Sequence, residues 1–292
     1  MHSAVKTLAA CAILGASVAW YLSAPSALPL EVAAGHQPDA GNGALVFAAS
    51  GCSSCHAAPD AADKNVLAGG YALVIDFGTF YAPNISWGPQ GIADWSLPEF
   101  AHALRQGVSP TGKHYYPAFP YTSYVRMTDS DVADLFAYMQ TLPADPTPNR
   151  PHDAGFPFNL SRGIGLWKRL YLTDAPVLEG DLSAEVIRGR YLVEGLGHCA
   201  ECHTSRDALG GLDKDRWLEG APNPSGKGRI PDISPTALDW SEGDLAAYFK
   251  SGFTPEYDSV GGSMAAVVEN LALLPDSDRR AIALYLKALP AP

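Results

Sequence analysis

One short motif occurs twice in this sequence, at an interval of 147 residues. A Cys-x-x-Cys-His motif begins at Cys52 and again at Cys199. An Asp-Trp-Ser triplet that contains Trp95 returns 145 residues later with Trp240, and an apolar segment near the end of each copy returns after 147. Offsets this constant indicate a duplicated domain. We therefore expect the same fold to occur twice along the chain.

Each copy has the pattern of a small helical domain. Three helices are expected per copy: one leading into the first cysteine, one opened by a capping box, and one closing the domain. The expected ranges are residues 42–49, from 96 onward and 129–142 in the first copy, and 184–194, from 241 onward and 276–289 in the second. A loop rich in Pro and Gly follows each motif and contains Pro83 or Pro231. The fold class is therefore predicted to be mainly α, with domains over residues 40–143 and 182–292.

Residues 144–181 join the two predicted domains. The segment carries large apolar side chains that are rarely left exposed together. They are Phe156, Phe158, Leu166, Trp167 and Tyr171. We therefore expect a linker that packs across both domains.

The histidine after each cysteine pair indicates covalent haem attachment. Two thiols separated by two residues can reach both vinyl groups on one porphyrin edge, and the next histidine then falls beneath the iron as proximal ligand. The predicted attachment residues are Cys52, Cys55, Cys199 and Cys202, and the predicted iron ligands are His56 and His203. Structural zinc would require both pairs in one four-ligand site, and a thioredoxin-like pair would require a βαβ context. The sequence favours two covalently bound haem c groups over either alternative.

The sixth iron ligand is predicted for the second haem only. Met264 lies in a Gly-rich loop before the closing helix, and a thioether ligand is soft, neutral and raises the reduction potential. In the first copy Phe119 stands where a methionine would be expected. Met127 and His114 are candidates there, although Met127 aligns with the apolar Leu274 and is as well explained by packing. A first haem without a side chain as sixth ligand is the remaining alternative.

Trp95 and Trp240 share a position directly before the second helix of each copy. An indole N–H only donates, so a buried one needs an acceptor. A haem propionate would satisfy it, and ordinary core packing is the alternative. Both tryptophans are therefore candidate haem contacts.

Charge argues against a nucleic-acid partner. Asp and Glu total 31 against 20 Lys and Arg, which gives a formal net charge of -11. Phosphate binding needs clustered basic side chains. An acidic surface suits encounter with a basic patch on another redox protein, or serves only to keep the chain dispersed.

Residues 1–30 are predicted to be a signal segment or a membrane anchor. Lys6 precedes an uncharged run from Thr7 to Leu22. At about 1.5 Å per residue the run spans about 24 Å, somewhat less than the ~30 Å of a bilayer core. Trp20 and Tyr21 lie where an interfacial aromatic belt is expected. An uncleaved anchor and a cleaved signal peptide both remain open, and either places the rest of the chain outside the cytoplasmic membrane.

The stretches 112–121 and 263–268 resemble those of a known family. They are similar to the membrane-associated multihaem cytochrome c subunits of bacterial periplasmic alcohol and aldehyde dehydrogenases, over about residues 40–290. The resemblance implies tandem class I cytochrome c domains, each with one covalently bound haem, on the periplasmic side of the membrane. That family commonly has methionine at the position of Phe119 and generally three haem modules, whereas this chain has two.

These features predict an electron-transfer protein rather than an enzyme by itself. The expected role is a relay between a donor such as a dehydrogenase and a downstream cytochrome or oxidase. The alternative is a haem enzyme that acts on a small substrate, such as a sulfur oxyanion or peroxide, at the first haem. The relay is favoured because no catalytic acid, base or basic cluster stands out beside that loop.

Overall fold

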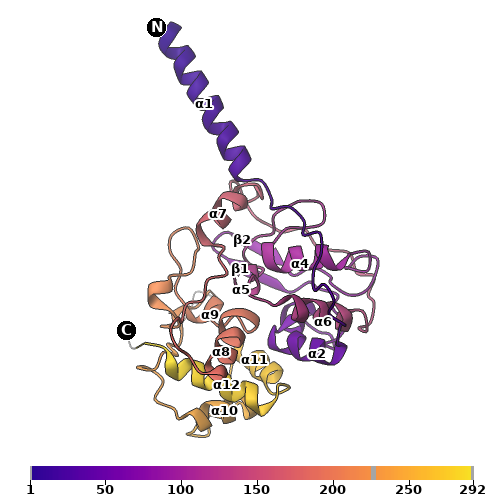
Figure 1. Cartoon of the computed structure of the whole chain (residues 1–292), viewed down its shortest axis with the longest axis vertical. Helices are drawn as coiled ribbons and strands as arrows, with labels where there is room; N and C mark the ends of the chain where they lie inside the picture. Colours follow the sequence, from indigo (N-terminus) through magenta and orange to yellow (C-terminus); the bar gives the residue numbers. More distant parts are fainter. Residues whose placement is uncertain (1, 225–227, 291–292) are drawn as a thin grey trace.

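A long N-terminal helix projects from a mainly helical body in the computed structural model, which describes residues 2–224 and 228–290 (Figure 1). This helix is α1 (His2–Leu22). The first half of the body contains α2 (Ala40–Ala49), α3 (Cys52–His56), α4 (Leu97–Gln106), α5 (Tyr121–Tyr124) and α6 (Asp129–Met139). After α7 (Gly163–Tyr171), the second half contains α8 (Ala184–Arg190), the π-helix η1 (Tyr191–Leu196), α9 (Ala200–His203), the 3-10 helix η2 (Lys214–Arg216), α10 (Glu242–Ser251), α11 (Met264–Leu271) and α12 (Asp276–Ala288).

A short antiparallel hairpin follows the cysteine motif in each half. The strands are β1 (Ala72–Ile75) with β2 (Gly78–Tyr81), and β3 (Ala221–Pro222) with β4 (Arg229–Ile230). Ala72 pairs with Tyr81, and Ala221 pairs with Ile230. Both pairs are offset by 149 residues, so the hairpin belongs to the repeated unit. No sequence pattern indicated this hairpin.

The predicted helices are present, with shifts at their ends. The capping boxes are confirmed: Ser96 accepts from the backbone N–H of Glu99, and Ser241 does the same for Asp244. The first opening helix begins two residues early because the Asp39 carboxylate accepts from the N–H of Gly41 and caps it there. The second opening helix becomes a π-helix after Arg190, and the closing helices end at Met139 and Ala288.

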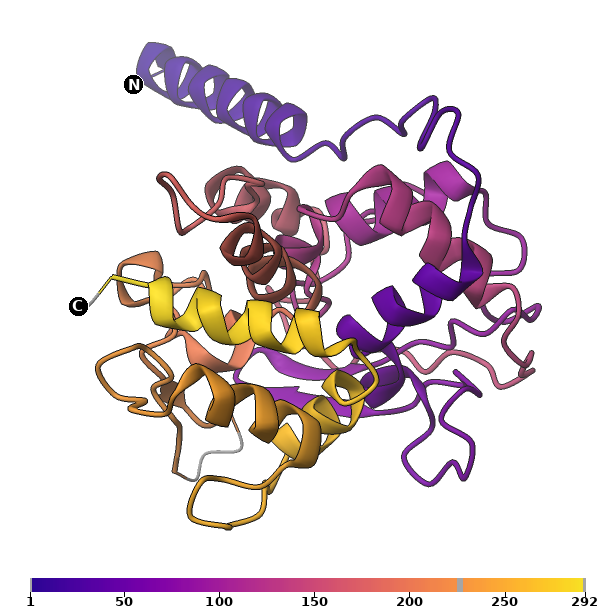
Figure 2. The ribbon, with the colours of Figure 1, turned by 60° about the horizontal axis from the view of Figure 1, so that its bottom comes forward.

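In each half the opening helix crosses the closing helix at a glycine. A Cβ added to Gly43 of α2 would lie 2.0 Å from the carbonyl oxygen of Asp134 in α6. A Cβ added to Gly189 of α8 would lie 1.9 Å from the carbonyl oxygen of Ala281 in α12. The backbones therefore touch at both crossings. Helix α12, yellow in Figure 2, runs across the front of the body, packed between α8 and α10.

The two halves form one body with a shared hydrophobic core. Polar contacts also cross between them. The Thr122 hydroxyl donates to Glu201 (2.9 Å), and the Asn270 side chain donates to the Ser54 hydroxyl (2.8 Å). These contacts join the segments around the first cysteine motif to those of the second half.

The linker leaves several of its large apolar side chains exposed, contrary to the expectation that they are covered. Phe156, Phe158 and Leu166 are exposed, while Trp167 and Tyr171 are half-buried. Helix α7 lies beneath the end of α1 in Figure 1 and still touches both halves: Lys168 donates to the carbonyl oxygen of Gly107 in the first half, and Trp167 and Tyr171 donate to Leu209 and Asp207 in the second. Three of the five large apolar side chains of this segment are therefore not covered by the protein itself.

Helix α1 is the one helix in the described residues that is long and apolar enough to cross a membrane. It begins at His2, before the uncharged run, and includes Lys6, whose long side chain can extend toward the interface. At a rise of ~1.5 Å per residue, its 21 residues span about 31 Å, close to the thickness of a bilayer core. The uncharged run alone is shorter than a bilayer core, but the complete helix is long enough to cross one.

Replacement of Asp134 by alanine is expected to destabilise the first half by about 2–3 kcal/mol, since the buried carboxylate accepts three partly buried hydrogen bonds that the variant loses. The carboxylate accepts from the Asp39 N–H (2.8 Å), from Asn42 Nδ2 (2.7 Å) and from His36 Nε2 (2.7 Å). Burial opposes its ionisation, but these hydrogen bonds outweigh burial and hold the pKa of Asp134 below its ordinary value. The stability they contribute is present above pH ~4 and lost as pH falls through the folded-state pKa. Denaturant unfolding of wild type and variant should therefore differ most near neutral pH and converge in acid. An equal difference in unfolding free energy at every pH would contradict this account. Alanine itself fits the helix crossing, because Ala281 stands at the matching position of α12.

Candidate haem sites

The two cysteine motifs form single helical turns, α3 and α9, at matching places in the two halves. Cys55 and Cys202 are exposed, whereas Cys52 and Cys199 are half-buried, and none of the four is in a disulfide. Each turn thus presents one accessible thiol and one facing the body. This arrangement fits two thioether bonds to one edge of a porphyrin.

Each motif histidine is oriented by a proline carbonyl. Nδ1 of His56 lies 2.8 Å from the carbonyl oxygen of Pro83, and Nδ1 of His203 lies 2.8 Å from that of Pro231. Because a carbonyl oxygen only accepts, Nδ1 carries the proton and the lone pair is on Nε2, as an iron ligand requires. Burial lowers the pKa of both imidazoles, which favours the neutral form. The sequence signal for this contact is the proline that recurs in the loop after each motif.

A glycine closes the same loop in both halves. The N–H of Gly69 donates to the carbonyl of His56, and that of Gly220 donates to the carbonyl of His203, both at 2.7 Å. Their φ values are 77° and 79°, in the left-handed region that favours glycine. Backbone groups therefore hold the motif histidine on both sides.

The thiols do not resemble those of a redox-active pair. Burial raises the pKa of Cys52 and of Cys199 to about 12. Catalytic Cys-x-x-Cys pairs depend instead on a lowered thiol pKa. Among residues 2–224 and 228–290, no cluster of three or more His, Cys, Asp or Glu could hold a metal ion, so no zinc-type site is formed by the protein alone. Both alternatives to haem are therefore weakened.

Phe119 occupies the place in the first half that Met264 occupies in the second. Gly107 ends α4 and Gly252 ends α10, both in the left-handed conformation and 145 residues apart. The same offset carries Phe119 onto Met264. Met264 is half-buried against the core at the start of α11.

The Phe119 ring belongs to an aromatic group. Its centroid lies 6.0 Å from that of Tyr115, 6.2 Å from Tyr121 and 5.8 Å from Tyr124. None of these side chains is a thioether or an imidazole. The loop that supplies methionine in the second half supplies packed aromatic rings in the first.

Met127 and His114 are both placed by contacts unrelated to an iron. Met127 is buried in the core, as is Leu274 at the matching position 147 residues later. His114 has a partner at each ring nitrogen: Nε2 is 2.9 Å from the carbonyl oxygen of Ser23, and Nδ1 is 3.1 Å from Nζ of Lys168. These contacts favour packing for Met127 and hydrogen bonding for His114.

The described residues include buried polar atoms without a hydrogen-bond partner, all in the first half. Three of them are good donors to a carboxylate: Nε of Arg105 and the hydroxyls of Tyr116 and Tyr121. Buried donors are nearly always paired in folded proteins. The donor set therefore fits a group that carries carboxylates, as haem does through its propionates. Trp95 and Trp240 are half-buried against the core, each directly before a capping box.

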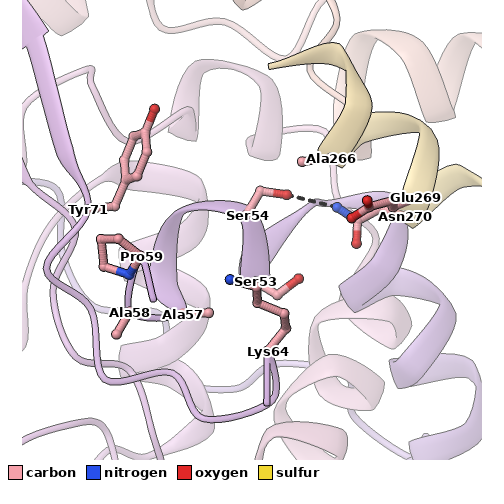
Figure 3. A pocket seen from close by; sticks show the side chains of 10 residues that line it. All are labelled: Ser53, Ser54, Ala57, Ala58, Pro59, Lys64, Tyr71, Ala266, Glu269 and Asn270. Atoms are coloured by element: carbon pink, nitrogen blue, oxygen red, sulfur yellow. Dashed lines mark hydrogen bonds between the residues drawn. The ribbon is translucent and has the colours of Figure 1, made fainter. Parts of the chain in front are cut away.

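A pocket of about 230 Å³ lies where α3 meets α11. Figure 3 shows Ser53 and Ser54 of α3 facing Ala266, Glu269 and Asn270 of α11, with the Asn270–Ser54 hydrogen bond across the junction. The first cysteine motif thus contacts the helix that Met264 begins. No sequence pattern signalled this contact, because its partners are 216 residues apart.

Comparison with known proteins relates the chain to cytochromes c. Residues 40–143 match the family described as cytochrome c. The chain is 54% identical to the diheme cytochrome c-type protein of Cereibacter sphaeroides over 99% of both chains. It is 36% identical to the fructose dehydrogenase cytochrome subunit of Gluconobacter japonicus, over 89% of this chain and 54% of that one. It is 33% identical to the cytochrome c subunit of the quinone alcohol dehydrogenase of Gluconobacter oxydans, over 93% of this chain and 60% of that one. The chain thus spans between half and two thirds of the two dehydrogenase subunits.

These relatives are named as cytochromes and cytochrome subunits, in agreement with the prediction of an electron-transfer protein rather than an enzyme by itself. The predicted cofactors are likewise confirmed as two covalently attached haem c groups. Near-complete coverage of the Cereibacter protein shows the family directly. The chain therefore belongs to the dihaem c-type cytochromes.

Proposed function

We propose that this chain is a membrane-anchored relay on the periplasmic side of the cytoplasmic membrane. It would take electrons from a dehydrogenase or another donor and pass them to a downstream cytochrome or oxidase. The dehydrogenase subunits among its relatives support this class of donor. Helix α1 would be the anchor, and residues 40–143 and 182–292 would be two tandem class I cytochrome c domains.

One observation carries the proposal: the same cysteine, histidine and proline arrangement occurs twice within one packed body. His56 and His203 have the same 2.8 Å contact to a proline carbonyl. In addition, α3 of the first half and α11 of the second are joined by the Asn270–Ser54 hydrogen bond. Two redox sites held by touching elements suit electron transfer within the chain.

The proposal gives each site the same set of roles. Two cysteines would hold each haem, and the following histidine would bind its iron; these are Cys52, Cys55 and His56, and Cys199, Cys202 and His203. Haem c supplies a one-electron couple when bound. Met264 would be the sixth ligand of the second haem, and Trp95 and Trp240 would contact propionates. Phe119 leaves the first haem without the corresponding methionine.

The protein's own contribution is to orient ligands and to exclude water. The proline carbonyls fix the ring plane and tautomer of each histidine, which is how outer contacts tune a metal ligand. The aromatic group around Phe119 keeps the loop of the first half packed and apolar. Different surroundings in the two halves would give the two sites different potentials.

The relay is tested with membranes from a strain of the source organism that lacks this chain. Purified full-length holoprotein is added back, and oxygen uptake driven by dehydrogenase substrates is followed together with reduction of both haems. We expect uptake to rise with added protein, and the added haems to be reduced before the oxidase turns over. Turnover of peroxide or a sulfur oxyanion by the purified protein, with no effect on respiration, would instead favour the enzyme alternative.

A further inference from the structure

The end of α1 is fastened to α7. Arg162 donates from Nη2 to the carbonyl oxygen of Trp20 (2.7 Å) and from Nε to the Ser23 hydroxyl (2.9 Å), and its guanidinium lies 4.2 Å from the Trp20 ring centroid. Arg169 donates to the carbonyl oxygen of Leu22 (3.2 Å). Two arginines thus cap the carbonyls that end α1, where cations are favoured.

The residues after α1 are also built into the body. Ser23 is buried, and its carbonyl lies 2.9 Å from Nε2 of His114. A Cβ on Gly165 of α7 would lie 2.3 Å from the same carbonyl oxygen, so only glycine allows this approach. Ser26 then bonds to Nε2 of His102 (2.9 Å). The direction of α1 is therefore fixed relative to the body.

Beside this junction lies a group of exposed apolar side chains, here called the α7 patch. Its members are Phe156 (80% exposed), Leu160 (55%), Leu166 (39%) and Leu170 (69%). Leu166 and Leu170 share one face of α7, and the other two precede the helix. Single exposed apolar residues are ordinary, but four large ones within 15 residues mark an interaction surface.

The electrostatics around the junction differ from those of the whole chain. Residues 1–30, 100–128 and 154–173 contain no Asp or Glu, although the net charge is -11. His102 and His114 bring the second segment to the residues that follow α1, and Arg162 brings the third to α1 itself. The exposed Lys113 and Arg169 lie in these acid-free segments. Asp207, which accepts from Tyr171 at the end of α7, is an acidic neighbour from outside these segments. Segments that carry basic and no acidic side chains suit approach to anionic lipid headgroups.

We propose that the α7 patch inserts into the headgroup layer of the membrane that α1 crosses. This inference rests on the proposed function, in which α1 is an anchor. The patch adjoins the end of α1, and aromatic and leucine side chains beside basic ones are typical of interfacial segments. The body would therefore rest on the membrane in one orientation. Helices α10 and α12, which lie at the far end of the body from α1 in Figure 1, would face the aqueous side.

The test uses full-length holoprotein in vesicles of zwitterionic and anionic phospholipid that include a lipid with a photoreactive acyl chain. Labelled peptides are mapped by mass spectrometry. We expect labelling of α1 and, at least fivefold above background, of residues 155–172. Phe253 and Tyr257, exposed in the loop after α10, serve as the apolar control and should stay at background.

A variant separates the patch from the anchor. Phe156→Ser with Leu160→Ser and Leu170→Ser changes only exposed side chains, so the fold should be retained; Phe253→Ser with Tyr257→Ser is the matched control. The patch variant should lose the labelling of residues 155–172 and broaden the orientation of the haem planes in oriented membranes, while α1 stays labelled. Labelling of α1 alone in the wild type would overturn the patch and keep the anchor. Absence of label from α1 would overturn the anchor, and the patch with it. Protection of residues 155–172 by a protein partner rather than by lipid would also overturn the proposal.

Discussion

Replacement of Gly189 by alanine is expected to destabilise the second half by about 3 kcal/mol or more, the upper end of overpacking effects. The added Cβ would lie 1.9 Å from the Ala281 carbonyl oxygen, 2.6 Å from its carbonyl carbon and 2.8 Å from Cβ of Tyr285. All three atoms belong to the backbone or the root of a side chain in α12. None can move aside by a rotamer change, so the helices themselves must separate.

Separation of these helices would also displace the second cysteine motif. Helix α8 continues into η1, which leads directly to Cys199. Buried Glu194 of η1 accepts from Tyr285 of α12 (2.8 Å) and from the N–H of Leu178 (3.0 Å). A displaced α8 would strain these buried hydrogen bonds, whose loss adds to the cost of the clash. We therefore expect a lower yield of protein carrying both haems as well as lower stability.

Guanidinium unfolding followed by far-UV circular dichroism measures the effect, with two alanine variants for comparison. Gly43→Ala should behave like Gly189→Ala, because its Cβ would meet the Asp134 carbonyl oxygen at 2.0 Å. Gly243→Ala is the matched control, since Gly243 is also helical but meets only the Ser241 hydroxyl, at 3.7 Å. It should gain about 0.5–1 kcal/mol from helix propensity. A Gly189→Ala protein as stable as wild type would show that the helices do not cross in backbone contact.

Features set by neighbouring residues could be predicted from the sequence. The capping boxes at Ser96 and Ser241 formed as expected because each involves residues only three apart. The repeat itself gave the position of each cysteine motif and of the closing helices. It also gave the equivalence of Met127 with Leu274, which the structure shows as two buried side chains.

Features set by distant partners could not be predicted. The hydrogen-bond partners of His114 are an example, since Ser23 and Lys168 are 91 and 54 residues away. No local pattern in the sequence indicates these contacts. The prediction that Phe156 is covered was wrong for a different reason. The residue type indicates that the side chain prefers an apolar environment, but not whether protein or lipid supplies that environment.

Replacement of Met264 by alanine is expected to free the sixth coordination position of the second haem. An alanine side chain cannot coordinate iron, and loss of a thioether ligand removes the contribution that raises the reduction potential. The potential of this haem should fall by on the order of 100 mV, a fraction of the roughly 0.8 V range set by axial ligands. The ferrous variant should bind one more carbon monoxide per chain than wild type. Spectra of both oxidation states, recorded with and without carbon monoxide during a potentiometric titration, measure both effects.

The repeat provides the controls for this experiment. Phe119→Ala truncates the matching position of the first half, so the potential and carbon monoxide binding of the second haem should stay unchanged. Phe119→Met makes the converse change, and if the first haem lacks a protein ligand, the new thioether should raise its potential and reduce its carbon monoxide binding. Met264 lies at the first turn of α11 and is only half-buried, so its replacement should leave the far-UV spectrum intact. Unchanged carbon monoxide stoichiometry in Met264→Ala would mean that another side chain ligates the second haem. The position shared by Phe119 and Met264 would then say nothing about which residue ligates either iron.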